Sequence, residues 1–223
     1  MLASQLQLGK VISAPFDENS YIAHWEGRDD CIVFDPGFDP DAVFDYLEQQ
    51  GLAPAAILCT HGHSDHIAGN AALKDRWPQA PLVIGVGDAY KLTDPAGNLS
   101  AAFGALLVSP PADRTVDEPE QFEAAGITLD VLATPGHSAG HVAFLCRQVE
   151  PWHVFGGDVL FRGSVGRTDF PDGDFDSLRA SIHDKLFSLP DNTIVLPGHG
   201  PVTDIGREKR SNPFVGAPAG YVS

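Results

Sequence analysis

The stretch Thr60-His61-Gly62-His63-Ser64-Asp65-His66 places three histidines and one aspartate within six residues. The apolar run at 56–59 directly before it is typical of a buried strand, and residues 67–74 after it have the pattern of a helix. The cluster is therefore expected on a loop between a strand and a helix, where a rigid scaffold commonly carries functional side chains.

The side chains in this stretch are of the kinds that bind divalent metals, because neutral imidazole and carboxylate groups are the usual ligands of zinc and related ions. His61 and His63 are two residues apart, so their rings can converge on one ion. Asp65 and His66 follow after the chain has turned, and they are not well placed to reach that same ion. The spacing predicts two neighbouring metal positions; the alternative is a solvated polar loop that binds no metal.

Composition limits the class of protein and the kind of partner. The chain has 223 residues, of which 43% are hydrophobic and 20% charged. These values are ordinary for a globular protein and predict a single domain over residues 1–223 with a substantial core. The formal net charge of -16 disfavours nucleic acid and anionic membranes as partners. An anionic small-molecule substrate would need local basic side chains.

The cysteines and the N-terminal segment suggest a compartment. Cys31, Cys59 and Cys146 are odd in number and lie in apolar runs, so we expect buried free thiols and a reducing environment. The first eight residues lack the charged start and apolar core of a signal peptide, and no apolar run has membrane-spanning length. The prediction is a cytoplasmic protein with no membrane partner.

Short apolar runs alternate with turns and helical patterns along the chain. Helical spacing predicts helices over 40–50, 67–74 and 174–188. Residues 87–120 are interrupted by prolines and predict a loop-rich insertion with a short helix at 101–107. Strands are expected at the apolar runs 11–12, 21–23, 31–34, 56–59, 81–85, 128–132, 141–146, 152–155 and 193–196.

Three further polar residues stand beside glycine at the ends of predicted strands. They are His137 after Thr134-Pro135-Gly136, Asp158 after Gly156-Gly157, and His199 within Pro197-Gly198-His199-Gly200. Glycine lets the backbone turn sharply and approach an ion closely. One such residue alone would more often be a turn residue. Four strand ends with matched chemistry indicate a metal centre, because buried histidine and aspartate without partners are costly.

The complete set resembles the ligand set of the metallo-β-lactamase superfamily, in order and approximate spacing, over about residues 10 to 200. The seven positions are His61, His63, Asp65, His66, His137, Asp158 and His199. The resemblance implies an α/β (α+β) fold, a four-layer αββα sandwich of two mixed sheets flanked by helices. It also implies two divalent metal ions as cofactors, zinc before iron or manganese.

The resemblance assigns each position a role. One ion would be held by the three histidines His61, His63 and His137. The other would be held by Asp65, His66 and His199, and Asp158 would bridge the two ions.

Two further residues are expected next to the ligands. Asp35, in an Asp-Pro-Gly turn, would orient a ligand, although a strand-end turn alone equally accounts for it. We expect His141 to be structural or to support a ligand, since the family has no ligand at that position.

Three segments, 157–161, 166–170 and 197–200, resemble glyoxalase II-like thioester hydrolases, and 207–214 resembles their bacterial single-domain type. The chain departs from the two-domain pattern, because the expected C-terminal segment is a short tail without the separate helical domain. Arg167-Thr168-Asp169 stands where the family has its Lys-x-Tyr glutathione contact. Arg167 can pair with a substrate carboxylate or form a surface ion pair with a nearby aspartate. The tail cations Arg207, Lys209 and Arg210 are expected near the same rim.

The resemblance implies hydrolysis of S-lactoylglutathione or related hydroxyacylglutathiones to a hydroxy acid and glutathione. A metal-bridging hydroxide would attack the thioester, with Asp65 positioning that oxygen. One alternative is a mononuclear-iron persulfide dioxygenase acting on glutathione persulfide, since such enzymes retain the same seven residues. Another is a metal-binding module without turnover. The segments at 164–165, 171 and 212–214 favour the hydrolase.

Overall fold

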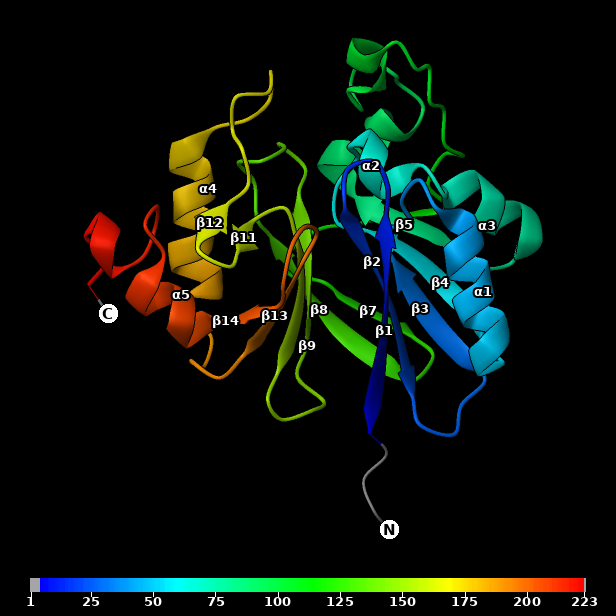
Figure 1. The fold of residues 1–223 in the computed structure, drawn as a ribbon, viewed down its shortest axis with the longest axis horizontal. Coiled ribbons are helices and arrows are strands. Elements are labelled where there is room, and N and C mark those ends of the chain that lie inside the picture. Colours follow the sequence, from blue (N-terminus) through cyan, green and yellow to red (C-terminus); the bar gives the residue numbers. More distant parts are fainter. Residues whose placement is uncertain (1–4, 223) are drawn as a thin grey trace.

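The computed structural model describes residues 5–222 as two six-stranded sheets packed face to face, with helices on both outer sides (Figure 1). The first sheet has the order β1-β2-β3-β4-β5-β6. Its first three strands pair antiparallel, and β3 to β6 pair parallel. The strands are β1 (Leu6–Ser13), β2 (Glu18–Trp25), β3 (Asp30–Phe34), β4 (Ala53–Cys59), β5 (Leu82–Gly85) and β6 (Arg114–Val116).

The second sheet has the order β14-β13-β10-β9-β8-β7, with β10 and β13 parallel and the other pairs antiparallel. A small hairpin of β11 and β12 stands apart from both sheets. The strands are β7 (Gln121–Ala124), β8 (Ile127–Ala133), β9 (Val142–Cys146), β10 (His153–Gly157), β11 (Leu160–Phe161), β12 (Ser164–Val165), β13 (Ile194–Pro197) and β14 (Thr203–Asp204).

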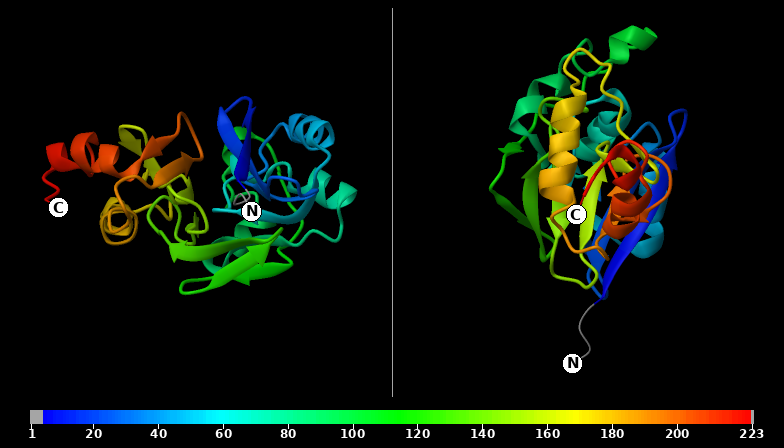
Figure 2. Two further views of the ribbon diagram at one scale, coloured as in Figure 1. Left: turned by 90° about the horizontal axis from the view of Figure 1, so that it is seen from below. Right: turned by 90° about the vertical axis from the view of Figure 1, so that its left-hand side faces the viewer.

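Helices cover the outer face of each sheet, and Figure 2 shows α1 and α5 on opposite sides of the molecule. The first sheet carries α1 (Pro40–Gln50), α2 (Ser64–Ile67) and α3 (Asn70–Arg76). The second carries α4 (Phe175–Ser181), which continues as a π-helical turn Ile182–Leu186, and α5 (Ile205–Ser211). The 3-10 segments are Val86–Leu92, Ser100–Phe103 and Ala217–Ala219. No helix within residues 5–222 is long and apolar enough to cross a bilayer.

The core lies between the sheets, where Phe34 of β3 stacks on Phe155 of β10 with ring centroids 3.8 Å apart. In β4, Ala56 and Leu58 face this core, whereas Ile57 and Cys59 pack under the helices of the first sheet. Alternate side chains of a strand point to opposite faces, so a strand covered on both faces is apolar throughout. This confirms the predicted four-layer sandwich.

The predicted helix over 40–50 is confirmed, and its ends have clear causes. The Asp39 side chain accepts a hydrogen bond from the amide of Ala42, Pro40 opens the helix, and Gly51 ends it in the left-handed conformation. The helical prediction over 174–188 is also confirmed, since helical structure runs from Phe175 to Leu186.

Other local predictions were wrong. The single helix expected over 67–74 is two short helices, because Gly69 packs on the turn after β3: its amide donates to the Pro36 carbonyl over 2.8 Å. A side chain there would meet the carbonyl oxygen of Gly37 at 2.9 Å. The helix expected over 101–107 is only the 3-10 turn at 100–103. The short elements β7, β14 and α5 were not anticipated.

Candidate metal centre

Loops at one edge of the sandwich bring all seven predicted ligand residues together. The loop after β4 and the start of α2 provide His61, His63, Asp65 and His66; the loops after β8, β10 and β13 provide His137, Asp158 and His199. The carboxyl ends of the parallel strands β10 and β13 share this edge with the end of β4. Strand direction therefore explains why residues far apart in sequence meet here.

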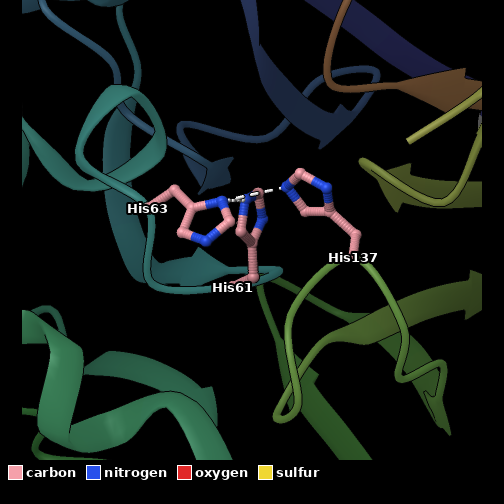
Figure 3. Close-up of side chains that lie close together, drawn as sticks. All are labelled: His61, His63 and His137. Carbon is pink, nitrogen blue, oxygen red and sulfur yellow. Dashed lines mark hydrogen bonds between the residues drawn. The ribbon is translucent and has the colours of Figure 1, made fainter. Parts of the chain in front are cut away.

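Three buried histidines form one part of the cluster (Figure 3). His61 Nε2 lies 3.1 Å from His63 Nδ1, which lies 2.9 Å from His137 Nε2. The rings come from two different loops and direct these nitrogens toward one another. Burial and the neighbouring histidines lower the pKa of His61 well below its usual value and that of His63 to about 3. Both rings are therefore neutral and have lone pairs free for a metal.

A second group adjoins the first, and a third set of ligand atoms overlaps both. Ligand atoms of Asp65, His66 and His199 lie within 4.8 Å of one another, as do those of His61, His66 and Asp158. Asp158 stands between the groups: its Oδ1 is 3.5 Å from His66 Nε2, and its Oδ2 is 3.5 Å from both His137 Nε2 and His199 Nε2.

Buried polar atoms without partners show that this donor set fits a divalent metal. His66 Nε2 and Asp158 Oδ1 are buried, and neither has a hydrogen-bond partner among residues 5–222. Such atoms are rare in folded proteins unless another group completes them. A cluster of imidazoles with carboxylates suits zinc, iron or manganese.

Comparison with known proteins agrees with this geometry. Residues 14–199 match the family model described as the metallo-beta-lactamase superfamily. The chain belongs to this superfamily. The probable metallo-hydrolase YqgX of Bacillus subtilis is 37% identical over 90% of this chain and 93% of its own. The hydroxyacylglutathione hydrolase GloC of Haemophilus influenzae is 35% identical over 86% of this chain and 90% of its own.

Solved structures of the superfamily are similarly close. The B3 metallo-beta-lactamase BLEG-1 superposes with a TM-score of 0.88 at 36% identity, covering 94% of this chain and 99% of its own. TTHA1623, solved in a di-iron-bound form, has a TM-score of 0.81 at 38% identity over 92% and 99%. ETHE1 from Myxococcus xanthus has a TM-score of 0.76 at 28% identity over 95% and 85%. The superfamily match and the two curated relatives together support a metal-binding hydrolase.

Asp35 faces the superfamily ligand His66 and also shapes the turn after β3. Its carboxylate accepts hydrogen bonds from the Thr60 amide over 2.7 Å and the Thr60 hydroxyl over 2.8 Å. Its Oδ2 lies 3.2 Å from His66 Nδ1. The backbone of Asp35 has a φ of 47°, in the left-handed region that turns use. The same residue therefore forms the turn and contacts His66. A partner on the second ring nitrogen orients a metal-binding histidine.

His141 contacts two members of the cluster, Asp158 and His61. The amide of Asp158 donates to His141 Nε2 over 3.1 Å, so the ring proton is on Nδ1, which donates to the Thr134 hydroxyl over 2.9 Å. Both nitrogens are thus used within the protein. The ring also stacks on that of His61, with centroids 5.0 Å apart.

Two backbone carbonyls that sequence analysis missed orient superfamily ligands. His137 Nδ1 donates to the carbonyl of Arg167 over 2.8 Å, and His199 Nδ1 contacts the carbonyl of Phe16 at 3.1 Å. These bonds leave each Nε2 directed into the cluster. Because any residue provides a carbonyl, the sequence contains no signal for such contacts.

A cavity of about 350 Å³ opens beside the metal centre, and six of its fourteen lining residues are apolar. These are Phe16, Leu99, Phe103, Phe161, Val165 and Phe170. Arg167 also lines the cavity, but its guanidinium makes two bonds of 2.6 and 2.7 Å to Asp169 and lies over the Phe170 ring at 4.3 Å. Arg167 therefore has the aspartate partner that one of the two alternatives gave it, and pairing with a substrate carboxylate stays a prediction.

The tail cations do not reach this rim. Among the described residues that line the cavity, none comes from α5. Lys209 and Arg210 instead line a separate hollow with Asp191, and Lys209 pairs with Asp191 at 2.7 Å. The expectation that they approach the cavity was wrong, because α5 packs on the outer side of the second sheet (Figure 1).

Proposed function

We propose that this protein hydrolyses the thioester of S-lactoylglutathione or related hydroxyacylglutathiones, releasing a hydroxy acid and glutathione. The observation that carries the proposal is the pair of adjoining ligand groups with Asp158 between them, beside a cavity of about 350 Å³. The 35% identity to a hydroxyacylglutathione hydrolase supports the choice of substrate. We place the activity in the cytoplasm.

Two divalent ions, most simply zinc, would be held by the two groups described above. When bound, such ions polarise a carbonyl and lower the pKa of water from about 15.7 toward neutrality. Iron and manganese accept the same imidazole and carboxylate ligands, so the donor set alone does not select zinc.

Asp65 is the residue that handles the proton of the attacking water. It lines the cavity, and its Oδ2 lies 3.3 Å from His199 Nε2. Burial raises the pKa of Asp65, but His66 and His199 lower it by more, so the group is a carboxylate at neutral pH. A carboxylate at this position can orient a water molecule and accept its proton. The leaving thiolate is weakly basic and needs no strong acid.

Arg167 would bind a carboxylate of the glutathione moiety. It is the cation that lines the cavity among the described residues, and the net charge of -16 makes such a partner necessary for an anionic substrate. The substrate would compete with Asp169 for the guanidinium. We expect Arg167→Ala to raise KM for S-lactoylglutathione more than it lowers kcat, because a carboxylate remote from the reacting carbonyl contributes mainly uniform binding.

The superfamily also contains the persulfide dioxygenase alternative and lactamases. The similarity to BLEG-1, described as a B3 metallo-beta-lactamase, makes a β-lactam a necessary comparison substrate. These alternatives differ in product and in oxygen use, so parallel assays separate them.

The test uses the metal-replete protein and Asp158→Ala as its inactive control. We expect close to two metal ions per chain by elemental analysis and loss of the thioester of S-lactoylglutathione. Oxygen uptake with glutathione persulfide and a single iron would support the dioxygenase instead. Cleavage of a chromogenic β-lactam without thioesterase activity would support a lactamase. Bound metal without turnover of any of the three would leave a binding module.

A further inference from the structure

A lysine with no role in the proposed chemistry is fully buried behind the metal centre. Lys91 lies in the 3-10 segment 86–92, and its side chain is 1% exposed. Its Nζ is 2.6 Å from Asp172 Oδ2 and 3.3 Å from Asp88 Oδ1. Removing a lysine and an aspartate from water is costly even when they pair, so an interaction of this kind requires a structural or functional reason.

The fully buried Asp88 joins the two loops that carry the three-histidine group. Its Oδ2 accepts hydrogen bonds from the Gly62 amide over 2.9 Å and the Ser138 hydroxyl over 2.7 Å. Its Oδ1 accepts one from the Gly140 amide over 2.9 Å. Gly62 stands between the first two histidines of the group, and Ser138 follows the third. One carboxylate therefore sets the separation of the two loops.

Asp172 connects the same lysine to the loop 166–174 at the cavity wall. Its Oδ2 also accepts a hydrogen bond from the Ala139 amide over 3.1 Å. The same loop provides the Arg167 carbonyl that orients His137, and the Phe170 ring that lies 5.1 Å from His63. Lys91 thus links the cavity loop to the carboxylate that holds the ligand loops.

Close packing leaves these loops little freedom to adjust. A Cβ at Gly62 would come within 2.6 Å of Lys91 Cβ, and a Cβ at Gly140 within 2.1 Å of the Asp88 amide nitrogen. A change in the Lys91 side chain must therefore be transmitted to the backbone of the ligand loops.

The other ligand group has different supports. Asp35 lies against His66, and the Phe16 carbonyl contacts His199. Among the hydrogen bonds and ion pairs of residues 5–222, none joins Asp88 or Lys91 to Asp65, His66 or His199.

From this asymmetry we propose that the buried Asp88 and Lys91 form, with the partly exposed Asp172, an ion triad that positions the three-histidine group and docks the cavity loop. The triad does not set the geometry of the second group. The proposal depends on metal binding by the three histidines and not on the identity of the substrate. A failed thioesterase assay would therefore leave it standing.

The test measures zinc affinity by competition with a chromophoric chelator. The variant Lys91→Met keeps the length of the side chain and removes its charge. The matched control is Lys185→Met, which breaks a surface ion pair of 2.7 Å with Glu118. Two backgrounds isolate the groups: His199→Ala removes a ligand of the second group, and His63→Ala removes a ligand of the three-histidine group.

We expect Lys91→Met to weaken zinc binding about 10- to 100-fold in the His199→Ala background, the usual effect of losing a support behind a ligand. In the His63→Ala background it should leave zinc affinity unchanged, and Lys185→Met should have no effect in either. Absorption spectra of the Co²⁺-loaded protein should change only where the three-histidine group is present. Equal weakening in both backgrounds, or none in either, would overturn the proposal.

A second variant tests the same proposal in case Lys91→Met does not fold. Asp172→Asn alters a side chain that is 26% exposed, and it preserves the shape of the residue. It should weaken zinc binding in the same background and in the same direction. The double variant with Lys91→Met should bind zinc only a little more weakly than either single variant, because both changes break the same ion pair. Fully additive losses would show that the two residues act separately and would contradict the triad.

Discussion

Gly198→Ala adds a single methyl group at the metal centre. Gly198 precedes His199 and lies outside the left-handed region of φ, so alanine can adopt its backbone conformation. The new Cβ would lie 2.3 Å from Asp158 Oδ1 and 2.6 Å from His66 Cε1. Both neighbours are members of the ligand cluster. The substitution therefore displaces the shared carboxylate while every ligand side chain is kept.

The size of the effect follows from these distances. Reaching ordinary van der Waals separation requires the Asp158 oxygen to withdraw by about 1 Å. A displacement of about 1 Å in a catalytic group can lower the rate about a hundredfold, equivalent to about 2.7 kcal/mol of activation free energy. Because Asp158 stands between both ligand groups, we expect metal content to fall as well.

The assay compares thioester hydrolysis and bound metal in Gly198→Ala and in Gly156→Ala. A Cβ at Gly156 would meet Val195 Cγ1 at 3.5 Å and the Leu196 carbonyl oxygen at 3.8 Å, which are ordinary contacts. This control adds the same methyl group at a neighbouring strand end and should preserve activity, metal content and thermal stability. Circular dichroism would check that both variants are folded.

Retention of normal turnover and metal content by Gly198→Ala would refute the reasoning. It would mean that the Asp158 carboxylate can move without consequence and has no shared role at the centre. An equal loss in Gly156→Ala would show instead that a strand-end methyl group disturbs the fold in general.

Three more predictions follow from other contacts. Asp158→Ala should lower activity by several orders of magnitude and reduce bound metal, as measured by kinetics with elemental analysis; normal values for both would exclude a bridging role. Asp169→Ala should free the Arg167 guanidinium and lower KM for S-lactoylglutathione, whereas an unchanged KM would show that Arg167 does not bind this substrate. Burial raises the pKa of the Cys31 thiol from 9.0 to about 12, so the unfolded chain ionises first as pH rises. The free energy of unfolding in urea should therefore be fully maintained below pH 9.0, fall as pH rises toward about 12, and fall less steeply in Cys31→Ala.

Local patterns in the sequence determined much of the fold and the identity of the clustered side chains. The helix at 40–50 was predictable because its cap residues and apolar spacing are all local. The seven clustered residues were predictable because each stands at a strand end with a recognisable neighbour, and because their order resembles that of a known superfamily. The failures were short elements, such as the break at Gly69, where a contact with the distant Pro36 overrides the local helical pattern.

Only the tertiary structure decided which residues support the cluster and which reach the cavity. Asp88 and Lys91 lie in a proline-broken, loop-rich insertion in a part where no regular element is predicted, yet they become buried between ligand loops that are distant in sequence. The sequence alone placed Lys209 and Arg210 near the rim, but α5 carries them to another face. The ability to bind a metal belongs to individual side chains, so it can be predicted from the sequence. The positions of these side chains depend on long-range contacts between loops, and those contacts exist only once the two sheets have packed together.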